Sequence, residues 1–100
     1  MAIVAVSISP LGEGPSVSRY VAAAEKVLSG YPNIKRQIGP MFTTLEGDLA
    51  DIWQAIRAMQ EAVFELGAGR VVSTLTIDDR RDKEITMEGK VKAVEEKLHE

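Results

Sequence analysis

The amino-acid sequence predicts an α+β fold, in which two helices cover one face of a small antiparallel sheet and a further helix ends the chain. Residues 2–9 and 70–77 are rich in β-branched side chains and alternate in polarity, which is typical of half-buried strands. Residues 17–28 and 49–66 repeat apolar side chains at three- and four-residue steps, which is typical of amphipathic helices. Between these helices, a stretch interrupted by Gly39-Pro40 predicts two short strands.

Composition limits the protein class. The 100 residues, 45% of them hydrophobic, are enough for one folded domain spanning residues 1–100. A net charge of -3 favours neither nucleic acid nor an anionic membrane surface as a partner. The absence of cysteine excludes disulfides, thiolate metal sites and cysteine nucleophiles, and it suits a reducing cytoplasm. No apolar run approaches the roughly 18 residues of a membrane span. We therefore expect a cytoplasmic protein.

The first strand, Ala2 to Ser9, directs Val4, Val6 and Ile8 to one face. Its other face carries the smaller side chains Ile3, Ala5, Ser7 and Ser9. A loop containing Pro10, Gly12, Gly14 and Pro15 follows, and Ser16 or Ser18 is expected to cap the next helix. That helix should end at Gly30 and Pro32.

The middle of the chain predicts two strands and a long helix. Residues 34–38 are polar enough for a sheet edge, and residues 41–46 form the more central strand. Asp48 stands at the N-cap position, and Gly67 or Gly69 ends the helix. The expected apolar stripe of that helix, which places Trp53 in the core, is Leu49, Ile52, Trp53, Ile56, Met59, Val63 and Leu66.

The last third adds a strand and a helix. Arg70 to Ile77 is the fourth strand, and the balanced charges of residues 78–83 predict an ion-pair network. Residues 86–100 form a helix with a narrow apolar stripe of Met87, Val91, Val94 and Leu98. The order βαββαβ with an added C-terminal helix is the ferredoxin-like arrangement.

Because both crossover helices cover the same face, the other sheet face is expected to be open. Its expected residues are Ala5, Ser7 and Ser9 from the first strand, Phe42, Thr44 and Glu46 from the third, and Val72, Thr74 and Thr76 from the fourth. This hydroxyl-rich face is a poor lining for a dry core. It should meet water, a ligand or another sheet.

Several functions that this fold hosts lack their residues in this sequence. An RNA-binding sheet needs aromatic platforms, and only Phe42 is available. The first loop offers Glu13 where a phosphoryl-binding enzyme needs an arginine, and its glycines are not followed by Lys-Ser/Thr. His99 lies at the chain end, where a catalytic role is not expected. Asp48 is the expected helix cap, and Glu46 alone does not provide general acid–base catalysis. The sequence therefore predicts no enzyme, no metal and no cofactor.

The chain resembles the small thiamine-binding proteins of ferredoxin-like fold. The residues that carry the resemblance are Ser7 to Gly12 with Gly14, Ser16 to Val21, Gly39 to Met41 with Thr43, Glu46 to Asp48, Ile77 to Lys83, and Met87 to Val91. The Asp-Asp-Arg-Arg-Asp-Lys block that begins at Asp78 is the most specific of these. Phe42 and Gln60 depart from the family pattern, which has a small residue and a histidine at these places.

The resemblance implies non-enzymatic binding of thiamine or its hydroxymethylpyrimidine moiety by a homo-oligomer, often a tetramer. An aminopyrimidine requires a hydrogen-bond acceptor for its amine and hydroxyl or amide donors for its ring nitrogens. It also requires apolar walls for the faces of the ring. The expected binding residues are Ser7, Ser9, Thr44 and Glu46 for the polar groups, and Phe42 beside the cationic thiazolium. Glu46 is the expected orienting acid. The alternative is a structural or regulatory homo-oligomer whose polar sheet face is a subunit interface.

Overall fold

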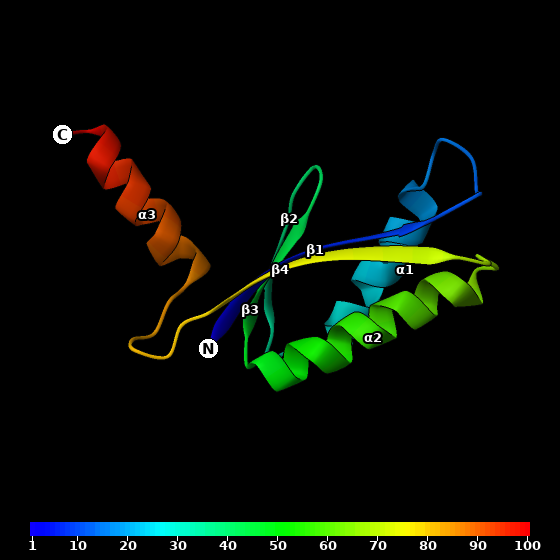
Figure 1. Ribbon diagram of the computed structural model, residues 1–100, viewed down its shortest axis with the longest axis horizontal. Coiled ribbons are helices and arrows are strands. Elements are labelled where there is room, and N and C mark those ends of the chain that lie inside the picture. Colours follow the sequence, from blue (N-terminus) through cyan, green and yellow to red (C-terminus); the bar gives the residue numbers. More distant parts are fainter.

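The computed structural model describes residues 1–100 and has the predicted order of elements (Figure 1). The elements are β1 (Ala2–Pro10), α1 (Ser18–Val27) with a 3-10 turn η1 (Leu28–Gly30), β2 (Lys35–Ile38), β3 (Thr43–Gly47), α2 (Leu49–Glu65), β4 (Val71–Asp79) and α3 (Met87–Leu98). The strands form one antiparallel sheet in the order β2-β3-β1-β4. This confirms the ferredoxin-like fold, with β2 at an edge and β3 inside the sheet.

The core lies between the sheet and the two crossover helices. Val4, Val6 and Ile8 of β1 and Leu45 of β3 face this layer and are buried. The helices contribute the buried residues Tyr20 and Ala24 from α1 and Ile52, Ala55, Ile56, Met59 and Val63 from α2. Alternation in the strands and three- and four-residue spacing in the helices therefore bring their apolar faces together, as predicted.

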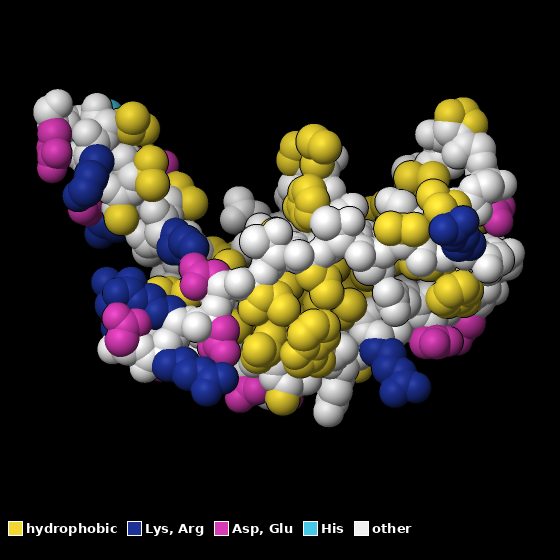
Figure 2. Space-filling model, viewed as in Figure 1, with side chains coloured by type: hydrophobic (Ala, Val, Ile, Leu, Met, Phe, Trp, Pro, Cys, Tyr) yellow, Lys and Arg dark blue, Asp and Glu magenta, His cyan; other side chains and the backbone are white.

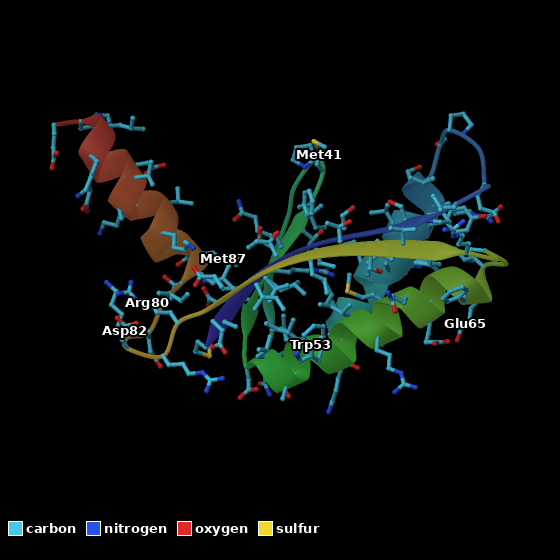
Figure 3. The ribbon with its side chains drawn as sticks, viewed as in Figure 1. Met41, Trp53, Glu65, Arg80, Asp82 and Met87 are labelled. Carbon is cyan, nitrogen blue, oxygen red and sulfur yellow. The ribbon has the colours of Figure 1, made fainter.

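Helix α2 begins and ends at the predicted signals. The Asp48 carboxylate accepts a hydrogen bond from the Ala50 amide at 2.9 Å, and Gly67 follows the helix with φ of 103°. Trp53 corrects the predicted stripe, because it is 48% exposed while Ala55 is buried. The buried face of α2 consists of Ile52, Ala55, Ile56, Met59 and Val63, and Trp53 lies beside this face, on the flank of the helix (Figure 3).

Helix α1 begins without the predicted serine cap. Its N-cap residue is Val17, and no side chain accepts a hydrogen bond from the first turn. The preceding loop is instead held from the side, where the Tyr20 hydroxyl donates to Glu13 Oε2 at 3.1 Å. Gly12 and Gly14 have φ near +85°, a conformation that favours glycine, so the loop can turn back onto α1.

The β2–β3 connection projects beyond the sheet, with Met41 at its tip (Figure 3). The Gly39 amide donates to the Phe42 carbonyl at 3.0 Å, and a Cβ on Gly39 would lie 2.6 Å from that oxygen. Phe42 therefore belongs to the turn and precedes β3. This corrects its expected place as a strand residue of the open face.

Strand β4 is longer than predicted and includes Asp78 and Asp79, which pair with Ile3 and Ala2 of β1. The charged block that starts there forms ion pairs, as expected. Arg80 donates to both Asp82 oxygens at 2.6 and 2.9 Å, and Arg81 donates to Asp79 Oδ2 at 3.1 and 3.3 Å. These pairs are local and exposed, so they shape the turn after β4.

Helix α3 stands away from the helix-covered side of the sheet (Figure 1). Its cap is Thr86, whose Oγ1 accepts from the Gly89 amide at 2.9 Å. Ile85 and Met87 pack with Ile3 in a small second cluster. Beyond this anchor, Val91, Val94 and Leu98 are 54%, 60% and 75% exposed, so the predicted stripe has no partner within the chain. None of the helices is long and apolar enough to span a bilayer.

Candidate ligand-binding site

A cavity of about 250 Å³ lies where β3 begins and β1 continues beyond its pairing with β3. The β3 pairing stops at Val6 opposite Thr43, whereas β4 accompanies β1 as far as Pro10. Residues 7–10 of β1 therefore have a strand on one side only. Helix α1 and the β2–β3 turn enclose the other side, and we call the space between them the β1–α1 cavity.

Glu25 is the only titratable side chain that lines this cavity. Its side chain is 12% exposed. Oε1 accepts a hydrogen bond from the Thr43 hydroxyl, and Oε2 lies 3.7 Å from Arg36 NH1. No group of the protein donates a hydrogen bond to the buried Oε2. Leaving a buried acceptor unpaired costs about 1–3 kcal/mol, more when it is charged, so a donor that reaches this oxygen after a turn of the side chain recovers that free energy.

Arg36 approaches Glu25 from β2 rather than from the cavity. Its guanidinium donates to the Glu25 carbonyl and is 37% exposed. It lines a shallow hollow on the outer side of α1, which we call the outer shelf. The shelf residues are Val17, Ser18, Val21, Ala22, Glu25, Lys26, Arg36 and Ile38. Glu25, Val17, Val21 and Ile38 line both spaces, so the cavity and the shelf adjoin along these residues.

The remaining walls of the cavity are mainly apolar. Val6, Ile8, Ala24 and Met59 form its floor from the core, and Ser7 and Ser9 line it from β1. Exposed apolar residues of the turn and of neighbouring elements surround its mouth, namely Val21, Ile38, Met41 and Phe42. A flat ring with polar groups on one edge suits such a site, because its faces meet apolar walls.

The structure separates the five predicted site residues into two groups. Ser7, Ser9 and Phe42 line the β1–α1 cavity. Thr44 lines a different hollow of about 300 Å³ on the open sheet face beneath α3, together with Ala5, Thr76 and Met87. Thr44 pairs with Ala5 of β1, two residues from Ser7 on the same sheet face, so Thr44 is a diagonal neighbour of Ser7 although it lines a separate hollow.

Glu46 lies beneath the start of α3. It is 8% exposed, and its Oε1 accepts from the Met87 amide at 2.7 Å. Glu46 pairs with Ile3, four residues from Ser7, which corresponds to about 13 Å along a strand. The alternation places Glu46 and Ser7 on one face, as expected. It does not reveal that α3 covers Glu46.

Three charged contacts fix the first turns of α3. Lys35 of β2 donates to Glu88, and this hydrogen bond raises the pKa of Lys35 above its ordinary 10.5. Lys90 donates to Asp78 Oδ2 at 2.6 Å. The carboxylate of Glu46 at the helix N-terminus also interacts favourably with the helix dipole. These three contacts therefore attach the N-terminal end of α3 to this end of the sheet.

Sequence reasoning missed Glu25, Thr43 and Arg36. Arg36 shares its face of β2 with Ile34 and Ile38, and Thr43 shares its face of β3 with Leu45. Glu25 follows Val21 by four residues and precedes Leu28 by three, so it borders the apolar stripe of α1. A polar side chain at a position that faces or borders the core was the sequence signal that could have identified these residues as site candidates. Gln60, which departs from the family pattern, donates to Ser73 Oγ and joins α2 to β4.

Known proteins with similar sequences share this fold. The family model for thiamine-binding proteins matches residues 4–95. The UPF0045 protein YqgV of Bacillus subtilis is 48% identical over 102 residues, which cover 98% of each chain. The UPF0045 protein MJ1052 of Methanocaldococcus jannaschii is 47% identical over 91 residues, covering 91% of this chain and 89% of the relative.

Solved structures agree with these matches. The crystal structure of MJ1052 covers 95% of this chain and 96% of its own, with a TM-score of 0.87 and 45% identity. The Thermotoga maritima protein TM0486, provisionally assigned to thiamine biosynthesis or salvage, gives a TM-score of 0.78 at 26% identity over 93% of this chain and 97% of its own. The fold, the full-length sequence similarity and the family match together show that this chain belongs to the thiamine-binding protein family.

Proposed function

We propose that this protein binds thiamine or its hydroxymethylpyrimidine moiety, with the pyrimidine ring in the β1–α1 cavity. The observation that carries the proposal is the Glu25 carboxylate on the cavity wall, whose Oε2 lies 3.7 Å from Arg36 NH1 but has no hydrogen-bond donor within the protein. An exocyclic amine on a pyrimidine would supply that donor. Membership of the thiamine-binding family and the assignment of TM0486 to thiamine biosynthesis or salvage support this ligand class.

The other lining residues suit the same ring. The Thr43 hydroxyl, which donates to Glu25, can accept from a ring substituent, and Ser7 and Ser9 line the cavity from the unpaired edge of β1. Val21, Ile38 and Phe42 offer apolar contact to its faces. We therefore assign Ser7, Ser9 and Phe42 to the ligand site with Glu25 and Thr43. Thr44 and Glu46 support α3 in this proposal.

We propose binding without catalysis. General acid–base chemistry requires groups that accept and donate protons at defined places on the substrate. The cavity offers a single carboxylate, and that carboxylate is engaged by Thr43 and Arg36. A carrier, sensor or salvage protein of the cytoplasm fits this chemistry and the cysteine-free composition.

We also propose that the protein acts as a homo-oligomer. The first unpartnered surface is the open sheet face together with the exposed side chains of α3, Val91, Val94 and Leu98. The second is the free edge of β4, where Ile77 is exposed and an apolar area lies near Trp53 (Figures 2 and 3). Two distinct unpartnered surfaces suit a tetramer with two kinds of interface.

Calorimetric titration tests the ligand proposal. The wild-type protein should bind thiamine, hydroxymethylpyrimidine or both, and Glu25→Gln should weaken that binding by about 1.5–3 kcal/mol, the range for a hydrogen bond to a charged group. Glu61→Gln, on the exposed side of α2, removes the same charge far from β1 and should bind like the wild type. A folded wild-type protein that binds neither compound would refute the proposal and favour the purely structural oligomer.

A further inference from the structure

We propose that the backbone of Ile8, on the unpaired edge of β1, recognises an aminopyrimidine in the β1–α1 cavity. Its N–H donates to a ring nitrogen, and its C=O accepts from the adjacent exocyclic amine. The inference rests on the proposed binding of the pyrimidine moiety. It identifies backbone atoms, rather than a side chain, as the groups that distinguish this ring from other rings.

The β1–β4 ladder shows to which side the Ile8 backbone points. The Leu11 amide donates to the Arg70 carbonyl at 2.9 Å, and this pair continues the β1–β4 register by one residue. Backbone groups of successive strand residues point to opposite sides of the strand. The N–H and C=O of Ser7 and Ser9 therefore lie on the β4 side, like those of Leu11. The N–H and C=O of Ile8 lie on the other side, toward β3.

The β1–β3 ladder stops before Ile8. The Gly39 amide donates to the Phe42 carbonyl, so the backbone of Phe42 faces β2 and that of Thr43 faces β1. Thr43 pairs with Val6, and β1 continues beside β4 alone beyond this point (Figure 1). No hydrogen bond from a turn, loop or side chain involves the Ile8 backbone. Its N–H and C=O are thus a free donor and a free acceptor side by side.

The β1–α1 cavity lies against this free edge. Val6 and Ile8 direct their side chains to the core face of the sheet, whereas Ser7 and Ser9 direct theirs to the open face. All four residues nevertheless line the one cavity. A space that borders both faces of a strand runs along its edge. The free backbone groups of Ile8 therefore face the cavity.

Pro10 limits what this edge can bind. It is the next residue of β1 whose backbone faces the same side, and it has no N–H. An added peptide strand needs a donor at every second residue, so it would find only one complete pair here. One donor beside one acceptor suits the edge of a single ring. In a 4-aminopyrimidine, the ring nitrogen is an acceptor and the adjacent amine is a donor, which is the complementary pattern.

The same two groups discriminate between amino- and oxo-substituted rings. In a pyrimidin-4-one, an oxygen replaces the amine and the adjacent ring nitrogen carries a hydrogen. That oxygen faces the Ile8 C=O and that hydrogen faces the Ile8 N–H, so both backbone groups lose their partners. The β1–β4 ladder holds this segment of backbone, which prevents it from turning away from the mismatch. The cavity should therefore reject the oxo counterpart of hydroxymethylpyrimidine.

Amide hydrogen exchange followed by NMR measures the Ile8 group directly, with Ser7 and Ser9 as internal controls. In the unliganded protein, the Ile8 amide should exchange at least about tenfold faster than the two serine amides, which are bonded to β4. Saturating hydroxymethylpyrimidine should slow the Ile8 exchange at least about tenfold and shift its amide proton downfield. An Ile8 amide that is as protected as the serine amides before ligand is added would overturn the inference.

Calorimetric titration with the 4-oxo analogue of hydroxymethylpyrimidine tests the recognition pattern. We expect this analogue to bind at least about tenfold more weakly than hydroxymethylpyrimidine. Equal affinities, or bound hydroxymethylpyrimidine that leaves the Ile8 amide unchanged, would overturn the inference while leaving pyrimidine binding intact. A folded protein that binds neither hydroxymethylpyrimidine nor thiamine would refute the proposed function, and the role of Ile8 would fall with it.

Discussion

Glu25 and Glu46 are both largely buried glutamates, yet their carboxylates meet different demands. Glu46 Oε1 accepts from the Met87 amide at 2.7 Å and fixes the start of α3. Glu25 has one oxygen on Thr43 and one with no donor inside the protein. At the scale of single residues, the first arrangement is a finished structural contact, and the second is the contact that we propose a ligand completes.

Replacing Glu46 should affect α3 and leave the ligand site unaffected. Glu46→Ala leaves the Met87 amide without its acceptor, and we expect a loss of about 1–3 kcal/mol in the free energy of unfolding. Glu46→Gln keeps an acceptor oxygen, so its loss should be smaller. Urea denaturation measures both, and titration with hydroxymethylpyrimidine should give wild-type affinity. A large loss of affinity in folded Glu46→Gln would restore the role that the sequence predicts for this residue.

The contact between Lys35 and Glu88 predicts a dependence on alkaline pH. The hydrogen bond raises the folded-state pKa of Lys35 above 10.5, so its stabilising effect is fully present below that pH. The effect is lost as the pH rises through the folded-state pKa. We expect Lys35→Met to melt slightly below the wild type at pH 8, and the difference should close above about pH 10.5. Melting curves of both proteins across this range provide the check.

At the scale of elements, most boundaries follow from local signals in the sequence. Asp48 and Gly67 delimit α2, and the alternation of β1 fixes which face is buried. Trp53 could not be placed, because apolar spacing does not show where a helix meets the edge of its sheet. The residues of the cavity were harder still to predict from the sequence, since a glutamate beside an apolar stripe usually faces solvent. Glu25 is enclosed only because β3 begins at Thr43 and the β2–β3 turn covers the next residues of β1.

The β2–β3 turn should tolerate no side chain at Gly39. A Cβ there would lie 2.6 Å from the Phe42 carbonyl, so Gly39→Ala must displace the turn that carries Phe42. We expect a loss of about 1–3 kcal/mol in the free energy of unfolding, as overpacking gives, and weaker ligand binding. Gly30→Ala is the matched control, because no atom lies within 4 Å of its added Cβ. Denaturation and titration that show equal behaviour of the two variants would mean that the turn yields without cost.

At the scale of the whole molecule, the proposed ligand site and helix α3 lie toward different ends of the β1–β3 pairing. The β1–α1 cavity lies beyond the last β1–β3 pair at Val6 and Thr43. Helix α3 is anchored near Ile3 and Glu46, at the opposite end of that pairing. Figure 2 shows apolar side chains along α3 that face the rest of the molecule across open space. Binding and assembly should therefore respond to different substitutions.

Removing α3 should separate these two properties. A protein ending at Ile85 loses the stripe of Val91, Val94 and Leu98 but keeps both layers of the main core. We expect sedimentation velocity at micromolar concentration to show oligomers for the full chain and a folded monomer for the shortened one. The shortened protein should melt at a lower temperature, because Ile3 and Glu46 become exposed, and it should still bind the pyrimidine.

A substitution within α3 tests the same surface without shortening the chain. Leu98→Glu places a charge in the exposed stripe and should shift the protein toward monomer, since a buried unpaired charge at an interface is costly. Glu96→Lys changes charge on the opposite side of the helix and should leave the oligomer unaltered. If the full chain sediments as a monomer at micromolar concentration, the assembly proposal fails. If Leu98→Glu and Glu96→Lys keep the same oligomer, the interface does not include the α3 stripe, and the free edge of β4 becomes the surface to change next.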